Sequence, residues 1–139
     1  MRIRLLALAT ALLMLVACSS PSKSSTKTIN VSIDEVLQQN VITRDITLAV
    51  SDTLKLTLGA NHSTPYRWTA DPKIGDGTIL RQGSHEYFHG DTDRVGAPGT
   101  EVWTFTALRP GETTIVASYG PIVGDAAPSC TFTANVTVH

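Results

Sequence analysis

Residues 85–89 read His-Glu-Tyr-Phe-His, which has the spacing of the zinc-peptidase pattern H-E-x-x-H. In that pattern both histidines lie on one face of a helix and bind Zn²⁺, while the glutamate polarises the metal-bound water. Asp91 and Asp93 follow closely enough to act as further ligands. Two glycines bracket the segment, however, and its central aromatic residues favour a strand, in which His85 and His89 would lie roughly 13 Å apart. We therefore predict solvent-facing histidines on a strand and its turn, and no metal site.

The elements that must position such residues are predicted to be strands. Apolar residues recur at every second position in residues 46–50, 54–58, 103–107, 115–119 and 132–138, which is the spacing of half-buried strands. Turn-forming residues separate these segments, and Thr fills many of the outward positions. The pattern predicts an all-β fold, an antiparallel β-sandwich of about seven or eight strands. Trp68, Trp103 and Phe105 are predicted to lie in its core.

Residues 31–41 give a less regular signal. Ile33, Val36 and Leu37 would line one side of a single helical turn, whereas Ile29, Val31 and Ile33 have the spacing of a strand. We favour an N-terminal strand in this region.

The first residues have the form of an export signal. Arg2 and Arg4 precede an apolar run over residues 5–16, which is too short for a membrane-spanning helix of about 20 residues. Residues 15–18 read Leu-Val-Ala-Cys, the pattern of a bacterial lipobox. An uncleaved transmembrane anchor is the alternative, but the run ends in small residues before a polar stretch. We predict a lipoprotein signal peptide over residues 1–17, cleavage before Cys18 and acylation of Cys18.

The segment after Cys18 is predicted to be a tether. Residues 19–28 are Ser, Lys, Thr and one Pro, so they cannot offset the entropy cost of ordering. We expect residues 18–28 to join one domain, residues 29–139, to a membrane through the lipid on Cys18. Ser19, rather than Asp, directly after the acylated Cys favours the outer membrane where the organism has one. The protein is thus expected to be exported and anchored to the cell envelope, facing the periplasm or the surface.

Composition narrows the class of partner. The chain has 139 residues, of which 42% are hydrophobic and 17% charged, which suits one soluble domain with a core. Removing residues 1–17 takes away two of the 11 Lys and Arg and none of the 12 Asp and Glu, which leaves a formal charge of −3. This balance argues against nucleic acid as a partner.

Cysteine usage argues against a disulfide. With Cys18 acylated, Cys130 is the only remaining thiol. Its position at the start of an alternating segment favours packing over catalysis. The sequence also places no Ser-His-Asp set and no convergent pair of carboxylates, so we do not expect an enzyme.

Two loop motifs carry a family resemblance. Residues 61–66 read Asn-His-Ser-Thr-Pro-Tyr and are followed by Arg-Trp, and residues 96–99 read Gly-Ala-Pro-Gly before Trp103 and Phe105. In this order they resemble the chagasin-like family of cysteine peptidase inhibitors, whose hallmarks are an Asn-Pro-Thr-Thr-Gly-Tyr loop followed by Trp and a later Gly-x-Gly-Gly loop. The resemblance covers about residues 54–138 and implies an immunoglobulin-like sandwich.

The resemblance also implies a function. In this family three loops at one end of the sandwich enter the active-site cleft of papain-like peptidases, and the middle loop lies over the catalytic cysteine. The chain would then be a monomeric, reversible, competitive inhibitor of a papain-like cysteine peptidase that needs no cofactor and no metal. The implied peptidase-binding residues are Asn61, His62, Ser63, Thr64, Pro65, Tyr66, Arg94, Val95, Gly96, Ala97, Pro98, Gly99, Gly120, Pro121, Ile122 and Val123.

The residue types of the first loop suit this role. Asn61 can bond its own backbone in a turn, and Ser63 and Thr64 can brace a loop tip. A braced loop loses little entropy on docking and does not easily reach the geometry of attack, so it can occupy a peptidase without being cleaved.

The chain departs from the family in two places. Pro65 stands where the family usually has Gly, so a turn with positive φ there would have to be rebuilt. Gly120, Pro121 and Ile122 stand where the family usually has Arg-Pro-Trp, and losing such an anchor can cost more than about 2 kcal/mol. These departures predict weaker or redirected inhibition. The alternative is a non-inhibitory binding or structural module of the cell envelope on an immunoglobulin-like scaffold.

Overall fold

The protein is represented by a computed structural model that describes residues 23–90 and 94–139. Nine strands and one short helix make up this part of the chain. In chain order they are β1 (Thr26–Val31), α1 (Ile33–Gln38), β2 (Val41–Leu48), β3 (Thr53–Ala60), β4 (Tyr66–Trp68), β5 (Lys73–Ile74), β6 (Leu80–Phe88), β7 (Gly99–Ala107), β8 (Gly111–Pro121) and β9 (Cys130–Val138).

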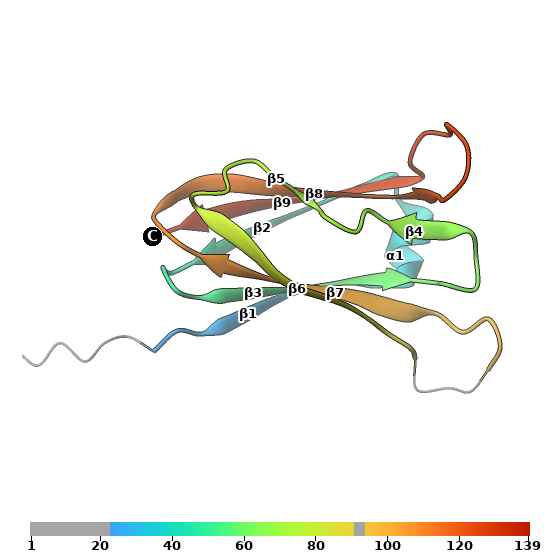
Figure 1. Ribbon diagram of the computed structural model, residues 1–139, viewed down its shortest axis with the longest axis horizontal. Helices are drawn as coiled ribbons and strands as arrows, with labels where there is room; N and C mark the ends of the chain where they lie inside the picture. The colour runs from blue at the N-terminus through green and yellow to red at the C-terminus, as the bar shows by residue number, and fades with distance from the viewer. Residues whose placement is uncertain (1–22, 91–93) are drawn as a thin grey trace, which may run out of the picture.

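The strands form two sheets packed face to face (Figure 1). One sheet has the order β1-β3-β7-β6, and the other has the order β2-β9-β8-β4 with β5 also paired to β8. The all-β sandwich is therefore confirmed, with nine strands rather than seven or eight. The expectation of a wholly antiparallel arrangement is wrong, because β1 pairs with β3 and β2 pairs with β9 in parallel. In each pair the first strand, β1 or β2, lies at the edge of its sheet.

The core lies between the sheets and follows the predicted period of two. Along β7 the side chains of Trp103, Phe105 and Ala107 are buried while the threonines between them are half-buried. The same alternation places Leu54 and Phe132 in the core from β3 and β9. Burial of such large apolar side chains contributes roughly 1.5–3 kcal/mol each, so this layer holds the two sheets together.

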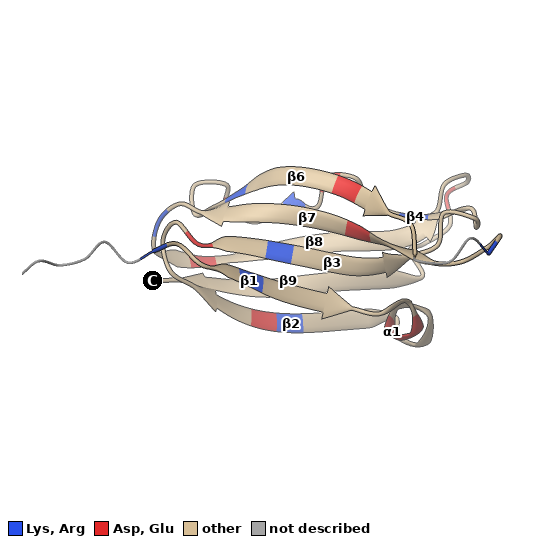
Figure 2. Ribbon diagram, turned by 90° about the horizontal axis from the view of Figure 1, so that it is seen from below, with Lys and Arg blue, Asp and Glu red and all other residues tan. Residues whose placement is uncertain are grey.

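The N-terminal region contains both elements that its sequence suggested. β1 ends at Val31, and Ser32 then caps the helix α1, so the predicted strand does not continue through Ile33. The Ser32 hydroxyl accepts from the backbone N–H of Glu35, and the Glu35 carboxylate accepts from the backbone N–H of Ser32. This capping box, with a further contribution from Arg44, lowers the pKa of Glu35. Figure 2 marks the acidic residues of α1 in red on the ribbon.

The predicted export signal lies mostly outside the described residues. The signal peptide over residues 1–17 and the acylated Cys18 fall in that undescribed part, so both stay predictions. The tether was predicted to reach residue 28, but β1 already begins at Thr26 because its backbone pairs with β3. Among residues 23–90 and 94–139, no helix is long and apolar enough to cross a membrane.

Cys130 is a packing residue, as expected. It is the first residue of β9, is fully buried and forms no disulfide with any described residue. Burial raises the pKa of its thiol, which keeps the sulfur protonated and unreactive at neutral pH.

Candidate functional site

Strand pairing brings the three predicted loops to one end of the sandwich. The last residue of β3, Ala60, pairs with Gly99 at the start of β7, and Tyr66 at the start of β4 pairs with Pro121 at the end of β8. The β3–β4 loop therefore lies between the β6–β7 and β8–β9 loops, at the right-hand end of Figure 1. We call residues 61–65 the central loop.

The central loop is braced by its own side chains. The Asn61 carboxamide oxygen accepts from the Ser63 backbone N–H at 3.0 Å and from the Ser63 hydroxyl at 2.5 Å. The Asn61 carbonyl accepts from the Thr64 N–H at 3.1 Å and from the Thr64 hydroxyl at 2.7 Å. The predicted bracing by Asn61, Ser63 and Thr64 is thus seen, and it restricts the loop before any partner binds.

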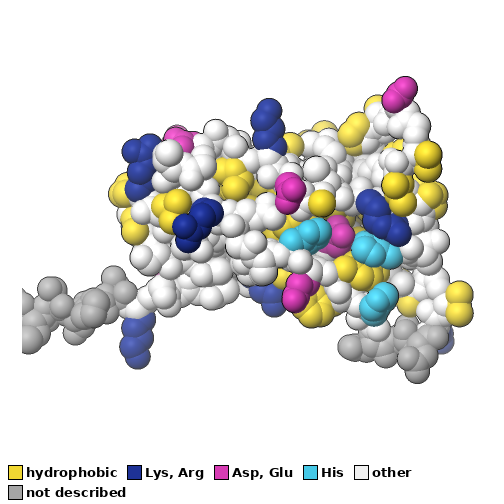
Figure 3. Space-filling model, in the orientation of Figure 1, with side chains coloured by type: hydrophobic (Ala, Val, Ile, Leu, Met, Phe, Trp, Pro, Cys, Tyr) yellow, Lys and Arg dark blue, Asp and Glu magenta, His cyan; other side chains and the backbone are white. Residues whose placement is uncertain are grey.

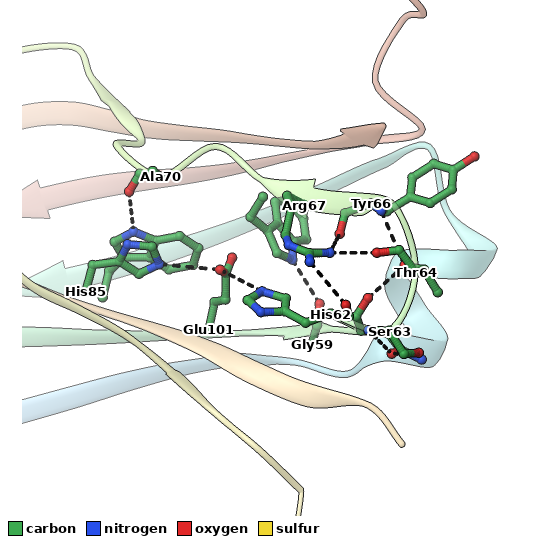
Figure 4. Close-up of polar contacts among 12 residues, drawn as sticks. Gly59, His62, Ser63, Thr64, Tyr66, Arg67, Ala70, His85 and Glu101 are labelled. Carbon is green, nitrogen blue, oxygen red and sulfur yellow. Dashed lines mark hydrogen bonds and ion pairs between the residues drawn. The ribbon is translucent and has the colours of Figure 1, made fainter. Parts of the chain in front are cut away.

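Arg67 adds a second set of braces that sequence reasoning missed. Its guanidinium donates to the backbone carbonyls of His62 at 3.1 Å, Thr64 at 2.7 Å and Tyr66 at 2.8 Å (Figure 4). A planar fork with several donors can satisfy three carbonyls at once. The only sequence signal was the position of Arg67 directly after the loop motif.

The central loop is also hydrogen-bonded to the β6–β7 and β8–β9 loops on either side of it. The Asn61 side-chain amide donates to the Gly96 carbonyl at 3.0 Å, and the Ile122 N–H donates to the Pro65 carbonyl at 2.8 Å. All three predicted loops are therefore joined through the central one. Pro65 fits this loop without strain from its fixed φ, because every positive φ among the described residues lies outside residues 61–66.

The β6–β7 loop has glycines with two different roles. Gly96 has a φ of +85°, a conformation that residues with a Cβ rarely adopt, and it supports the turn in which Ala97 N–H donates to the Arg94 carbonyl at 3.1 Å. Gly99 was predicted to contact the peptidase, but it is buried in β7, where a Cβ would collide with the Phe88 carbonyl. It fixes the base of the loop.

The tips of the two outer loops expose apolar side chains. Val95 is 104% exposed on the β6–β7 loop, and Ile122 and Val123 are 61% and 79% exposed after β8. Of the predicted third loop, Gly120 and Pro121 belong to β8, where both are half-buried. Apolar side chains are visible at the same right-hand end in Figure 3. These positions flank the central loop on both sides and would bring apolar area to a partner.

A groove runs beside the central loop and was not predicted. It has a volume of about 420 Å³, and α1 forms one of its walls. Sequence reasoning missed it because the helix was predicted as a strand. Its lining residues are Ile33, Val36, Leu37, Asn40, Asn61, Thr64, Tyr66, Tyr119 and Ser129.

The H-E-x-x-H segment is a strand, as predicted. His85 belongs to β6 and His89 follows its end, and within residues 23–90 and 94–139 no group of three His, Cys, Asp or Glu is arranged to hold a metal. The expectation of a solvent-facing His85 is wrong, since its ring stacks on Trp103 with centroids 4.5 Å apart and is only 27% exposed. Asp91 and Asp93 lie outside the described residues.

A buried carboxylate lies beneath the central loop. The side chain of Glu101, on β7, is 7% exposed, and its Oε1 lies 3.2 Å from His62 Nε2 and 3.6 Å from His85 Nε2. The His62 ring also stacks on Tyr87, with centroids 3.5 Å apart. In Figure 3 histidine side chains gather on one face of the molecule. No sequence motif pointed to this arrangement.

The comparisons with known proteins identify the family. The model for the Chagasin family peptidase inhibitor I42 matches residues 47–138. The chain therefore belongs to the chagasin family of peptidase inhibitors, which is a family of inhibitors and not of enzymes. No curated protein sequence matches the chain significantly.

Solved structures support the same fold. The cysteine protease inhibitor EhICP2 from Entamoeba histolytica is 18% identical with a TM-score of 0.66, covering 84% of this chain and 97% of that one. PbICP-C, solved in complex with falcipain-2, is 18% identical with a TM-score of 0.57, covering 83% and 98%. Amebosin is 23% identical with a TM-score of 0.54, covering 84% and 99%. At these identities the likeness establishes the sandwich fold.

Proposed function

We propose that this protein inhibits papain-like cysteine peptidases reversibly by placing its three joined loops in the active-site cleft. The observation that carries the proposal is the central loop, which is braced internally and hydrogen-bonded to both neighbouring loops. Family membership supports the inhibitory role. The similar fold of PbICP-C, solved with falcipain-2, supports the class of target.

The chemistry required is occlusion rather than reaction. The family resemblance implies that the central loop, on which Ser63 and Pro65 are exposed, would lie over the catalytic cysteine. Its backbone is held by Arg67, which donates to the His62 carbonyl, and by Asn61, whose side-chain oxygen accepts from the Ser63 N–H. A backbone held in this way does not relax toward the geometry of nucleophilic attack, so it blocks the cleft without being cut.

The outer loops would supply apolar contacts on either side. Val95 and Ile122 are exposed aliphatic side chains in positions flanking the central loop. They contribute less area than an aromatic anchor would, which predicts a weaker or redirected interaction.

The test is a titration of papain, and of a cathepsin L-type enzyme, with the purified protein, followed by residual activity on a small fluorogenic peptide. We expect saturable inhibition that increasing substrate overcomes. Absence of inhibition by folded protein at high micromolar concentration would overturn the proposal and favour a non-inhibitory envelope module.

We also propose that the protein is exported and anchored to the cell envelope by a lipid on Cys18. The proposal rests on the lipobox at residues 15–18 and the polar residues that follow it. Expression of the full chain in a bacterium with a labelled fatty acid should label the wild type but not Cys18→Ser, and fractionation should place the wild type in the outer membrane. Equal labelling of both proteins would refute the assignment.

A further inference from the structure

The carboxylate of Glu101 is buried although it lies next to exposed loops. It lies under the central loop and is almost fully buried, and both nearby imidazoles approach the same oxygen, Oε1. Its second oxygen, Oε2, is buried and has no hydrogen-bond partner among the described residues, and the same is true of His85 Nε2. We call His62, His85 and Glu101 the His–Glu cluster (Figure 4).

Burying a carboxylate with only part of its bonding satisfied costs free energy. A valine or leucine at this position would avoid that cost, so the carboxylate needs a role. The contact between His62 and Glu101 spans 39 residues of sequence and connects the central loop to β7. It is a direct bond between a side chain in the middle of the central loop and a buried side chain of β7.

The strength of this contact depends on the charge of His62. A neutral imidazole donates an ordinary hydrogen bond to the carboxylate, or none in the other tautomer, whereas an imidazolium donates a charge-assisted bond that is roughly twice as strong. Histidine changes charge between about pH 5 and pH 8. Protonation of His62 would therefore strengthen the attachment of the central loop.

We propose that Glu101 and His62 are positioning residues for the inhibitory loop, and that inhibition of a papain-like peptidase tightens as pH falls from 8 to 5. This inference rests on the proposed function. Protonation stiffens the free protein's loop before docking, so less entropy is lost on binding. Glu101 acts through His62, since its own side chain is buried away from any partner.

Other groups around His62 do not supply the same effect. From β6, Tyr87 stacks on its ring, and His89 meets Tyr87 edge-on. From β4, Arg67 bonds the His62 backbone carbonyl. From β6, His85 also faces this carboxylate, with its Nε2 3.6 Å from the same oxygen, Oε1. The carboxylate is thus the common acceptor, and replacing it removes the response of both imidazoles.

The experiment compares wild type with Glu101→Gln, measuring inhibition constants against papain at several pH values from 5 to 8. Dividing the two constants at each pH cancels the pH dependence of the peptidase. We expect this ratio to change about fivefold in favour of the wild type between pH 8 and pH 5. Glu86→Gln removes the same charge from an exposed position on β6 and should follow the wild-type profile.

A second readout needs no peptidase. Amide hydrogen exchange at Ser63 and Thr64 reports the order of the central loop, and at each pH the two proteins can be compared directly. We expect greater protection in the wild type at pH 5 and little difference at pH 8. If wild type fails to inhibit papain, the proposed function fails while the exchange experiment still decides this inference.

A second variant tests the inference even if Glu101→Gln does not fold. His62→Phe keeps a ring to stack on Tyr87 but cannot titrate, and it should lose the same pH response. Wild-type pH profiles in both variants, for inhibition and for exchange, would overturn the inference.

Discussion

At the end of the sandwich where the chain terminates, the turn between β2 and β3 closes on the buried carboxylate of Asp52, whereas the loop end carries the more fully exposed apolar tips. Asp52 is 4% exposed and accepts from the backbone N–H groups of Ser25 and Ala49, both at 2.9 Å. Val95 and Ile122, on the outer loops of the other end, point their side chains outward. The same strands run to both ends of the sandwich, so the packing between strands does not explain the difference in exposure.

The contrast shows that polar bonds serve different purposes at the two ends. Around Asp52 they satisfy backbone groups of the fold itself. In the central loop, the bonds of Asn61 and Arg67 hold a backbone that covers no core of its own. The first kind should matter for unfolding, and the second for binding. The following variants test that division in order of their expected effect on inhibition.

Thr64→Arg should weaken inhibition of papain more than about a hundredfold, because it places a long charged side chain in the middle of the proposed contact surface. The melting temperature should stay close to that of the wild type, since Thr64 lies in a loop. Thr137→Arg, on an exposed position of β9, is the matched control and should inhibit normally. Undiminished inhibition by Thr64→Arg would show that the central loop is wrongly assigned.

Arg67→Lys should weaken inhibition about tenfold, because an ammonium group cannot hold the carbonyls of His62, Thr64 and Tyr66 together. Inhibition constants and loop amide exchange should change in parallel. Arg81→Lys, exposed on β6, provides the control. If exchange quickens but inhibition does not change, bracing of the loop contributes nothing to binding.

Ile122→Asp should weaken inhibition by about three- to fivefold through loss of apolar contact on one flank. Val50→Asp replaces an aliphatic residue that is 40% exposed in the turn at the opposite end and should leave inhibition unchanged. Equal losses in the two variants would mean that the exposed apolar tips have no special part in binding.

Asp52→Asn should leave inhibition at pH 7 unchanged and lower the stability of the fold above about pH 4, with little effect in stronger acid. Backbone N–H groups of Ser25 and Ala49 lower the pKa of Asp52, so its stabilising effect is present above the unfolded value of 3.8 and is lost as pH falls through the lower folded value. Wild type should therefore melt higher than the variant at pH 7, with the difference narrowing below about pH 4. Asp125→Asn, exposed in the β8–β9 loop, is the matched control for the loss of one carboxylate. A constant difference at all pH values would contradict this role for the Asp52 carboxylate.

Much of the architecture was predictable because it depends on local spacing. The alternation around Trp103 and Phe105 predicted both the strand and its buried face. The helix α1 was missed although Ser32 and Glu35 form a capping box, since strand spacing upstream was given more weight. The parallel pairings were missed because register between distant strands leaves no mark in either strand alone.

In the candidate site, too, the local contacts were predictable and the long-range contacts were not. Asn61, Ser63 and Thr64 interact within three residues of one another, so turn chemistry predicted their bonds. The contact of His62 with Glu101 joins residues 39 apart and became visible only when β3 and β7 were paired. Gly99, predicted to contact the peptidase, proved to be buried at the base of its loop.

By itself the sequence determined the strand-rich fold, the family motifs and the local bracing of the central loop, because each depends on residue types at short separation. Only the tertiary structure decided which loops touch, which carboxylate lies beneath them and which end of the molecule exposes its apolar side chains. Those properties depend on the pairing of β3 with β7 and of β4 with β8, which brings together residues that are far apart in the chain.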